Sequence, residues 1–371
     1  MKFIKIPAFA IVLLLLMQIV SKVFIAIDSS DIENIYGFYA EPKNSLDMVM
    51  IGPSEVYTGY APALAWEEYG LKSCNLSIGA VPCNMYKSIV TEIVKRQKPK
   101  LLIINAAAFS HGNWNLTDEV FLRKWIDNIP MSQNKLDTVK TIPKNINKDD
   151  EKVKDNISDT LYFPLEKYHG NWKDPDAVYT SFVTRTYMRL SGGGYLKGFF
   201  SKTGITGGRD NLANIGQPTK EAYVLTDECR AYLKELLSYC NKLGVEHVLL
   251  LQPPHETQAA DKSGLEQIES ITKEYGYDFL DLSTDYESIV GIDDSHDFAD
   301  FEHLNAYGAQ KLSSYIGNLA VNQYGIKSDT SDSELSRWEK SVKRTKKALK
   351  MAREYTDRGE AQVVGEYEAA K

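Results

Sequence analysis

Short apolar runs alternate with helical patterns along two parts of the chain. The runs at 47–52, 72–76 and 101–104 have the length of strands and show no clean polar alternation, which is typical of a sheet covered on both faces. The segments between them, 62–70 and 84–97, place apolar residues at helical spacing. This part of the chain therefore predicts strand, helix, strand, helix, strand.

The same alternation resumes after a long gap. A helical pattern from Thr226 to Leu243 precedes a strand at 248–251, and a second helical pattern at 265–271 precedes a strand at 279–282. A last core helix begins near Asn305. Five strands with helices between them predict an α/β fold with a doubly wound parallel sheet.

Residues 110–225 interrupt this alternation. The part at 143–160 is polar and charged and predicts an exposed loop, whereas Phe163 and Trp172 add aromatic side chains nearby. A long insertion between core strands often builds the wall or lid of a site. Its aromatic residues would either stack on sugar rings or pack locally under a loop.

Residues 1–27 form a separate segment. Lys2 and Lys5 precede apolar runs at 6–20 and 23–27, and the whole stretch of about 22 residues is long enough to span roughly 30 Å of bilayer. Lysines before the run and acids after it favour an N-terminus inside the cell. The sequence predicts an uncleaved single-pass anchor at the cell membrane with an extracytoplasmic domain, and a cleaved signal peptide is the alternative.

The C-terminal segment 328–371 is polar and follows the predicted central domain, 28–327. Its residues 337–353 hold eight basic side chains against one acid and predict a helix. Such a tail would either lie on an anionic surface, such as lipid headgroups or a wall polymer, or remain solvated without a partner.

Composition narrows the choice of function. The 371 residues carry a net charge of −7, so a nucleic-acid partner is not expected. No Walker-type loop or dinucleotide fingerprint occurs, and the four cysteines lack metal-ligand spacing. They are interpreted as small buried residues, and no metal or organic cofactor is expected.

The candidate chemistry begins at Ser54, in Ile51-Gly52-Pro53-Ser54-Glu55. The preceding strand would place this hydroxyl at the carboxyl edge of the sheet, where α/β proteins bind ligands. Ser54 is interpreted as a nucleophile, and the alternative is a helix cap. A serine hydroxyl is a weak nucleophile and needs a base that is itself oriented by an acceptor.

Asp300-Phe301-Glu302-His303-Leu304-Asn305 supplies such a base. The spacing of three in a turn before a helix can place Asp300 and His303 on one side, so that His303 faces Ser54. Asp293 and His296 have the same spacing, but the later pair is favoured because the predicted helix follows it directly. The backbone N–H groups of Ser54 and Gly79 and the side chain of Asn105 are candidate oxyanion donors.

These segments resemble the SGNH, or GDSL-like, hydrolase superfamily. Ile51-Gly52-Pro53-Ser54 resembles its nucleophile block, Asn75-Leu76-Ser77-Ile78-Gly79 its glycine block, and Asp300-x-x-His303-Leu304-Asn305 its acid/base block. Asn105-Ala106-Ala107-Ala108 departs from the usual Gly-x-Asn-Asp. With the strand order, the resemblance covers residues 47–325.

The resemblance implies a flavodoxin-like sheet and a triad of Ser54, His303 and Asp300 that cleaves or transfers acyl groups. The predicted anchor is similar to that of accessory proteins of teichoic-acid D-alanylation and surface-polysaccharide O-acetylation, so a cell-surface polysaccharide or other acylated glycan is the expected partner. Gly-Pro-Ser-Glu differs from the usual Gly-Ser-Ser-His or Gly-Asp-Ser. The alternative is a non-catalytic glycan-binding or scaffold protein of the cell envelope with the same fold.

Overall fold

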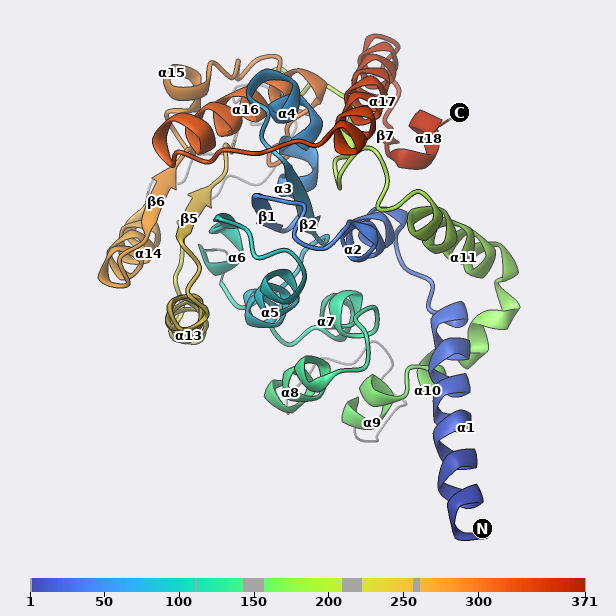
Figure 1. The fold of residues 1–371 in the computed structure, drawn as a ribbon. Helices are drawn as coiled ribbons and strands as arrows, with labels where there is room; N and C mark the ends of the chain where they lie inside the picture. Colours follow the sequence, from blue (N-terminus) through green and yellow to red (C-terminus); the bar gives the residue numbers. More distant parts are fainter. Residues whose placement is uncertain (1, 111, 143–156, 209–221, 256–260, 371) are drawn as a thin grey trace.

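The centre of the molecule is a five-stranded parallel sheet (Figure 1). The computed structural model describes residues 2–110, 112–142, 157–208, 222–255 and 261–370. The strands are β1 (Met48–Gly52), β2 (Ser73–Ser77), β3 (Leu101–Asn105), β5 (His247–Gln252) and β6 (Asp278–Asp281). Their order is β2-β1-β3-β5-β6, which confirms the predicted α/β class and parallel sheet. The order reverses between β1 and β3, the position at which such sheets form ligand sites.

The strands are apolar throughout because both faces of the sheet are covered. Alternate residues point to opposite faces, so Val49 and Ile51 of β1 join one core while Met48 and Met50 join the other. Helices α5 (Tyr86–Arg96), α13 (Asp227–Leu243) and α14 (Ser263–Glu274) contribute to the first core. Helices α4 (Pro62–Tyr69) and α16 (Ala306–Asn318) contribute to the second core (Figure 1).

The predicted insertion lies between β3 and β5 and is mostly helical. Of the polar stretch 143–160, residues 143–156 lie outside the described residues, and α9 begins at Ile157. The elements of the insertion are α6 (Ala107–Ser110), α7 (Glu119–Ile126), α8 (Gln133–Thr141), α9 (Ile157–Tyr162), α10 (Leu165–Tyr168), η2 (His169–Lys173), α11 (Pro175–Leu190) and β4 (Ser201–Lys202).

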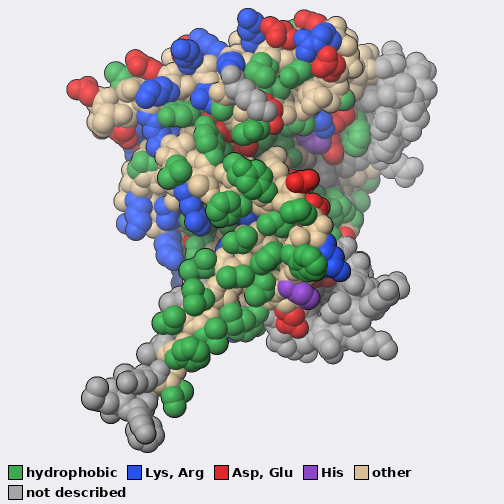
Figure 2. All heavy atoms as spheres, turned by 90° about the vertical axis from the view of Figure 1, so that its right-hand side faces the viewer, with side chains coloured by type: hydrophobic (Ala, Val, Ile, Leu, Met, Phe, Trp, Pro, Cys, Tyr) green, Lys and Arg blue, Asp and Glu red, His purple; other side chains and the backbone are tan. Residues whose placement is uncertain are grey.

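The N-terminal helix α1 (Lys2–Phe24) corrects one prediction. No helix in the described part of the chain combines the length and the apolarity needed to cross a membrane, so the predicted single-pass anchor and the cell-membrane localisation built on it are wrong. The second half of α1 uses polar groups to contact the domain: Gln18 Nε2 donates to the Tyr162 carbonyl at 3.0 Å, and Lys22 Nζ donates to the Ile129 carbonyl at 3.2 Å. Figure 2 shows hydrophobic side chains along the exposed sides of α1.

The basic C-terminal segment is packed against the domain. Helix α17 (Asp332–Asp357) buries one stripe of side chains, and the Trp338 ring stacks on Trp66 of α4 with centroids 5.7 Å apart. The Lys197 ammonium lies 4.9 Å from the centre of the Trp338 ring, within the range of a cation–π contact. The chain then forms β7 (Val363–Val364) and α18 (Glu366–Ala370).

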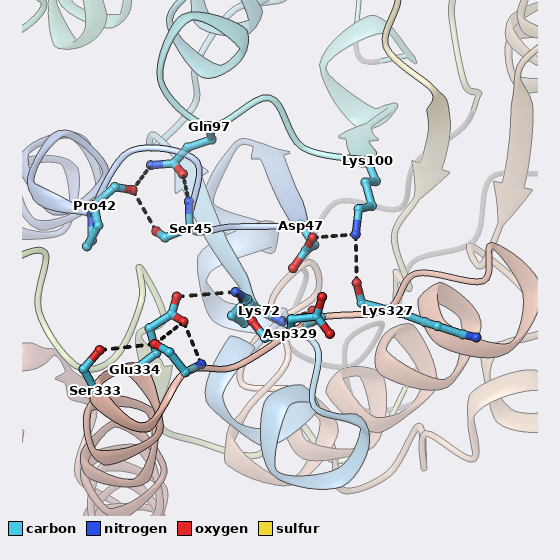
Figure 3. Close-up of polar contacts among 12 residues, drawn as sticks. Pro42, Ser45, Asp47, Lys72, Gln97, Lys100, Lys327, Asp329, Ser333 and Glu334 are labelled. Atoms are coloured by element: carbon cyan, nitrogen blue, oxygen red, sulfur yellow. Dashed lines mark hydrogen bonds and ion pairs between the residues drawn. The ribbon is translucent and has the colours of Figure 1, made fainter.

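Two lysines attach the connection before α17 to the amino edge of the sheet (Figure 3). Lys72, just before β2, donates to the Asp329 carbonyl at 2.6 Å and lies 3.4 Å from Glu334 Oε1. Lys100, just before β3, donates to the Lys327 carbonyl at 2.8 Å. The connection therefore crosses the edge opposite to the one that carries Ser54.

Replacing Trp338 by alanine tests whether α17 belongs to the folded domain. Trp338 is only 4% exposed, so Trp338→Ala should lower the free energy of unfolding by about 3–5 kcal/mol. Urea denaturation of the full chain measures this change. Leu335→Ala, at a residue of the same helix that is 41% exposed, should stay within about 0.5 kcal/mol of the parent. Equal, small effects of both substitutions would contradict the packing described.

Candidate active site

Ser54 is separated from β1 only by Pro53 and takes the first position of the short helix α3 (Ser54–Gly59). The turn before it is tight because Gly52 faces the side chain of Asn105 at the end of β3. A Cβ atom on Gly52 would lie 2.4 Å from the Asn105 Cβ and 2.7 Å from Val56 Cγ2. Only glycine fits there, and the close approach joins the carboxyl ends of the two central strands beside Ser54.

Ser77, at the end of β2, supports the same turn from the neighbouring strand. Its Oγ lies 2.6 Å from the carbonyl oxygen of Pro53 and 3.0 Å from that of Gly52, so the hydroxyl donates to this carbonyl pair. The sequence places Ser77 in the glycine block, but its contact with the nucleophile turn was not predicted. The contact depends on the parallel pairing of Gly52 with Ser77, which no local motif specifies.

The three residues predicted to act together form one hydrogen-bonded chain. His303 Nε2 lies 2.7 Å from Ser54 Oγ, and His303 Nδ1 lies 2.7 Å from Asp300 Oδ1. An ionised carboxylate can only accept, so we assign the proton to Nδ1 and leave Nε2 free to accept the serine proton. This tautomer is the one that a general base requires.

Asp300 is held by backbone donors as well as by the imidazole. Its Oδ1 accepts from the N–H groups of Glu302 at 3.1 Å and His303 at 2.9 Å, and its Oδ2 forms an ion pair with Lys202. Burial alone would raise the pKa of this carboxyl. The hydrogen bond and charge of His303, together with Lys202, outweigh burial and hold the pKa of Asp300 well below its ordinary value of 3.8. Asp300 is therefore ionised at neutral pH.

Lys202 is the charged residue of this site that the sequence analysis missed. It lies on β4, which pairs antiparallel with β7 of the C-terminal segment. Its ammonium lies beside Asp300 and 3.2 Å from His303 Nδ1. Because Lys202 stands in no motif and depends on pairing between distant segments, no sequence signal marks it.

Asn305 joins the acid/base turn to α16. Its Oδ1 caps the helix by accepting from the N–H groups of Tyr307 at 2.9 Å and Gly308 at 3.3 Å. Its Nδ2 donates to the carbonyls of His296 at 2.7 Å and Gly204 at 3.0 Å. The cap explains why Asp-x-x-His-Leu-Asn forms a unit, since the turn that carries both side chains is closed by the asparagine.

The competing pair, Asp293 and His296, is arranged differently. His296 Nδ1 lies 3.0 Å from Asp297 Oδ1, and Asp293 Oδ1 accepts from the backbone N–H of Ser295 at 2.9 Å. The structure thus brings the later Asp-x-x-His pair, and not this one, to Ser54.

The three predicted oxyanion donors differ in availability. The Ser54 N–H begins α3 and has no acceptor within the helix. The Asn105 side chain accepts from Ala107 N at 2.7 Å through Oδ1, whereas its buried Nδ2 has no hydrogen-bond partner among the described residues. The Gly79 N–H is occupied, because it donates to Asp31 Oδ1 at 2.7 Å. These roles stay predictions, and that of Gly79 requires Asp31 to release it.

Asp31 reaches the Gly79 loop from α2 (Ser29–Ala40) and is fully buried. Burial raises its pKa, partly offset by the Lys124 ammonium at 3.0 Å and by the Gly79 N–H. No local pattern predicts this contact, because it joins a polar connector to a loop about fifty positions away.

The side chains at the site are suited to moving a proton between oxygen and nitrogen. In the described ranges, no group of three or more His, Cys, Asp and Glu side chains is placed to hold a metal ion. The residues form a hydrogen-bonded series of a hydroxyl (Ser54), an oriented imidazole (His303) and an ionised carboxylate (Asp300). The buried amide of Asn105 lies nearby. This set of groups suits nucleophilic attack by serine.

Replacing Asp300 by asparagine tests its charge through stability. Because the folded state lowers the pKa of Asp300, its ionised form stabilises the fold above about pH 4, and this contribution is lost as the pH falls below the ordinary value of 3.8. Asp300→Asn, which can still accept the backbone N–H groups, should cost about 1.5–3 kcal/mol at pH 7. The difference should shrink when urea unfolding is repeated near pH 2.

Lys202→Met serves as the companion variant, since it removes one of the charges that lower the pKa of Asp300. It should reproduce part of the pH-dependent difference. A stability difference between Asp300→Asn and the parent that does not change with pH would contradict the assigned charge.

No protein-family model matches the chain, and no curated protein matches its sequence. The chemistry assigned to the site therefore depends on the geometry of Ser54, His303 and Asp300.

Proposed function

We propose that this protein is a serine acyl esterase or acyltransferase of the SGNH type that acts on an acyl ester of a glycan. The hydrogen-bonded chain from Ser54 through His303 to Asp300, at the carboxyl edge of the sheet, carries the proposal. It is supported by the tight Gly52 turn, which presents the hydroxyl at the point where the strand order reverses.

In the first half of the reaction, Ser54 Oγ attacks the carbonyl carbon of the ester and its proton passes to His303 Nε2. The carbonyl double bond becomes an oxyanion, and the positive imidazolium is stabilised by Asp300. When the tetrahedral intermediate collapses, the bond to the alcohol oxygen breaks and His303 returns the proton to that oxygen. The product is an acyl ester on Ser54 and a free hydroxyl on the first substrate.

The second half repeats these steps with another nucleophile. His303 removes a proton from water or from a sugar hydroxyl, and the resulting oxygen attacks the acyl group on Ser54. Water gives a free acid, whereas a sugar hydroxyl gives a new ester. Esterase and transferase activity use the same residues and differ only in which acceptor reaches the acyl-serine.

The glycan part of the proposal comes from the resemblance to the SGNH superfamily, whose members often cleave or transfer acetyl esters on carbohydrate. The insertion adds exposed aromatic side chains, because Trp114 is 55% and Trp172 is 65% exposed. Large flat side chains at the surface are suited to contacts that need apolar area with little loss of conformational entropy.

One observation favours a second function, a non-catalytic glycan-binding protein. The Gly79 N–H donates to Asp31, and Pro53 has no N–H to offer beside the nucleophile. Two backbone positions that could stabilise an oxyanion are thus occupied or lacking a donor. A protein of this kind would keep the fold and bind an acylated glycan without turning it over.

Labelling with a fluorophosphonate probe decides between these functions. The full chain should label at Ser54, because the probe reacts with a serine activated by a neighbouring base. Ser54→Ala should abolish labelling, and His303→Ala should slow it by about 10²–10⁴-fold, the usual contribution of general base catalysis. Gel fluorescence and peptide mapping give the rate and the site.

His296→Ala is the matched control, since this histidine belongs to the competing motif and contacts Asp297 instead of Ser54. It should label like the parent. Absence of labelling in a folded parent protein that still binds acylated glycan, unchanged by Ser54→Ala, would replace the enzyme proposal by the binding function.

A further inference from the structure

Two of the four cysteines lie next to each other. All four thiols are buried and free, at Cys74, Cys83, Cys229 and Cys240. The Sγ atoms of Cys83 and Cys229 are 3.7 Å apart although the residues are 146 positions apart in the chain. This pair was not considered from the sequence, because the proximity arises only when the insertion returns to the sheet.

Cys83 and Cys229 lie on two elements that can move closer to each other. Cys83 begins a single 3₁₀ turn, η1 (Cys83–Met85), and Cys229 lies in the first turn of α13, where its N–H donates to the Thr226 side chain at 3.2 Å. A disulfide has an S–S distance of about 2.05 Å, so the sulfur atoms must close by roughly 1.7 Å. One short turn against a helix end can provide such a movement, whereas a sheet strand, such as the one holding Cys74, cannot move as easily.

The thiols differ in a way that suits thiol–disulfide exchange. The Cys83 S–H donates to Cys229 Sγ, and this hydrogen bond lowers the pKa of the Cys229 thiol. Burial raises the pKa of the Cys83 thiol well above its ordinary value. Cys229 is therefore the better thiolate and nucleophile, and Cys83 is the thiol that resolves the first product.

Cys229 lies beneath a surface loop. Its Sγ is 3.5 Å from the Gly112 carbonyl oxygen and 3.5 Å from Asn113 Oδ1. Asn113 and its neighbour Trp114 are exposed. A local opening of this loop would uncover the sulfur without unfolding the sheet.

We propose that Cys83 and Cys229 form a disulfide when the protein meets a small-molecule disulfide. The Cys229 thiolate attacks one sulfur atom of the oxidant and breaks its S–S bond. This forms a mixed disulfide on Cys229 and releases the other half of the oxidant as a thiolate. Cys83 gives up its proton and attacks Cys229 Sγ, which expels the second thiolate. The protein loses two hydrogen atoms, and the oxidant is reduced to two thiols.

The cross-link would restrain the loop that carries Gly79. Cys83 lies four residues after Gly79. The loop is already joined to the segment that carries Asn115, because Asn115 Nδ2 donates a hydrogen bond to the Ala80 carbonyl at 2.9 Å. Asn84 Nδ2 adds a bond to the Leu116 carbonyl at 3.1 Å. A covalent bond to α13 would hold these contacts together. The proposal does not depend on whether Ser54 is catalytic.

Refolding in a redox buffer tests whether the disulfide forms. Because the protein is first unfolded, burial of the thiols cannot keep the oxidant from reaching them. The full chain is unfolded in urea, refolded with reduced and oxidised glutathione, alkylated, and examined for free thiols, intact mass and linked peptides. We expect two of the four thiols to be lost, a mass lower by two hydrogens, and a single linked peptide pair that contains Cys83 and Cys229. Because the disulfide closes a long loop, it should raise the midpoint of thermal unfolding by about 5–10 °C. Adding a reductant should reverse this increase.

Cys229→Ser and Cys240→Ser are the matched variants, since both positions lie on α13. Cys229→Ser should retain all three remaining thiols and lose the redox-dependent shift of the midpoint, whereas Cys240→Ser should still lose two thiols. Four free thiols in the refolded parent, a stable glutathione adduct, or a link between other cysteines would each overturn the proposal.

Discussion

The contact between His303 and Ser54 depends on how closely α16 packs against the chain that follows the nucleophile. Ala61 N donates to Ser313 Oγ of α16 at 2.8 Å. A Cβ on Gly317 would lie 2.6 Å from the Tyr69 ring, so a glycine is needed for the helices to approach. A hydrogen bond of 2.7 Å is lost when its atoms move apart by about 1 Å, and small residues at the helix interface are what keep this distance.

The charged side of the site depends on the C-terminal segment. Gln362 N donates to Thr203 Oγ1 at 2.7 Å, directly after Lys202. Glu366 accepts from the backbone N–H groups of Tyr195 at 2.8 Å and Leu196 at 2.7 Å. These bonds fasten β7 and α18 to the end of the insertion, and the paired strand directs Lys202 toward Asp300. Residues near the end of the chain therefore help to set the environment of the carboxylate.

The sequence was sufficient for features that a local pattern encodes. Apolar runs mark the five strands because a parallel sheet must be apolar on both faces, and the Asp300 to Asn305 turn is a compact unit in which the cap, the base and the acid lie within six residues. A local pattern could not reveal the roles of Lys202 and Asp31 or the pairing of Cys83 with Cys229. Each of these contacts joins side chains from segments that meet only in the folded chain. The N-terminal prediction was wrong because no helix in the described part of the chain is long and apolar enough to cross a membrane. Gln18 and Lys22 of α1 instead find hydrogen-bond partners on the domain.

Asp300 has two cationic neighbours, and their roles differ. Lys202 pairs with Oδ2, whereas the imidazole of His303 is the group that takes up the serine proton in the proposed reaction. The Lys202 ammonium, 3.2 Å from Nδ1, opposes that new charge, while Asp300 Oδ1 at 2.7 Å favours it. The carboxylate is closer and hydrogen-bonded, so attraction exceeds repulsion. Lys202 thus helps to keep Asp300 ionised and fixed in position for the proposed reaction.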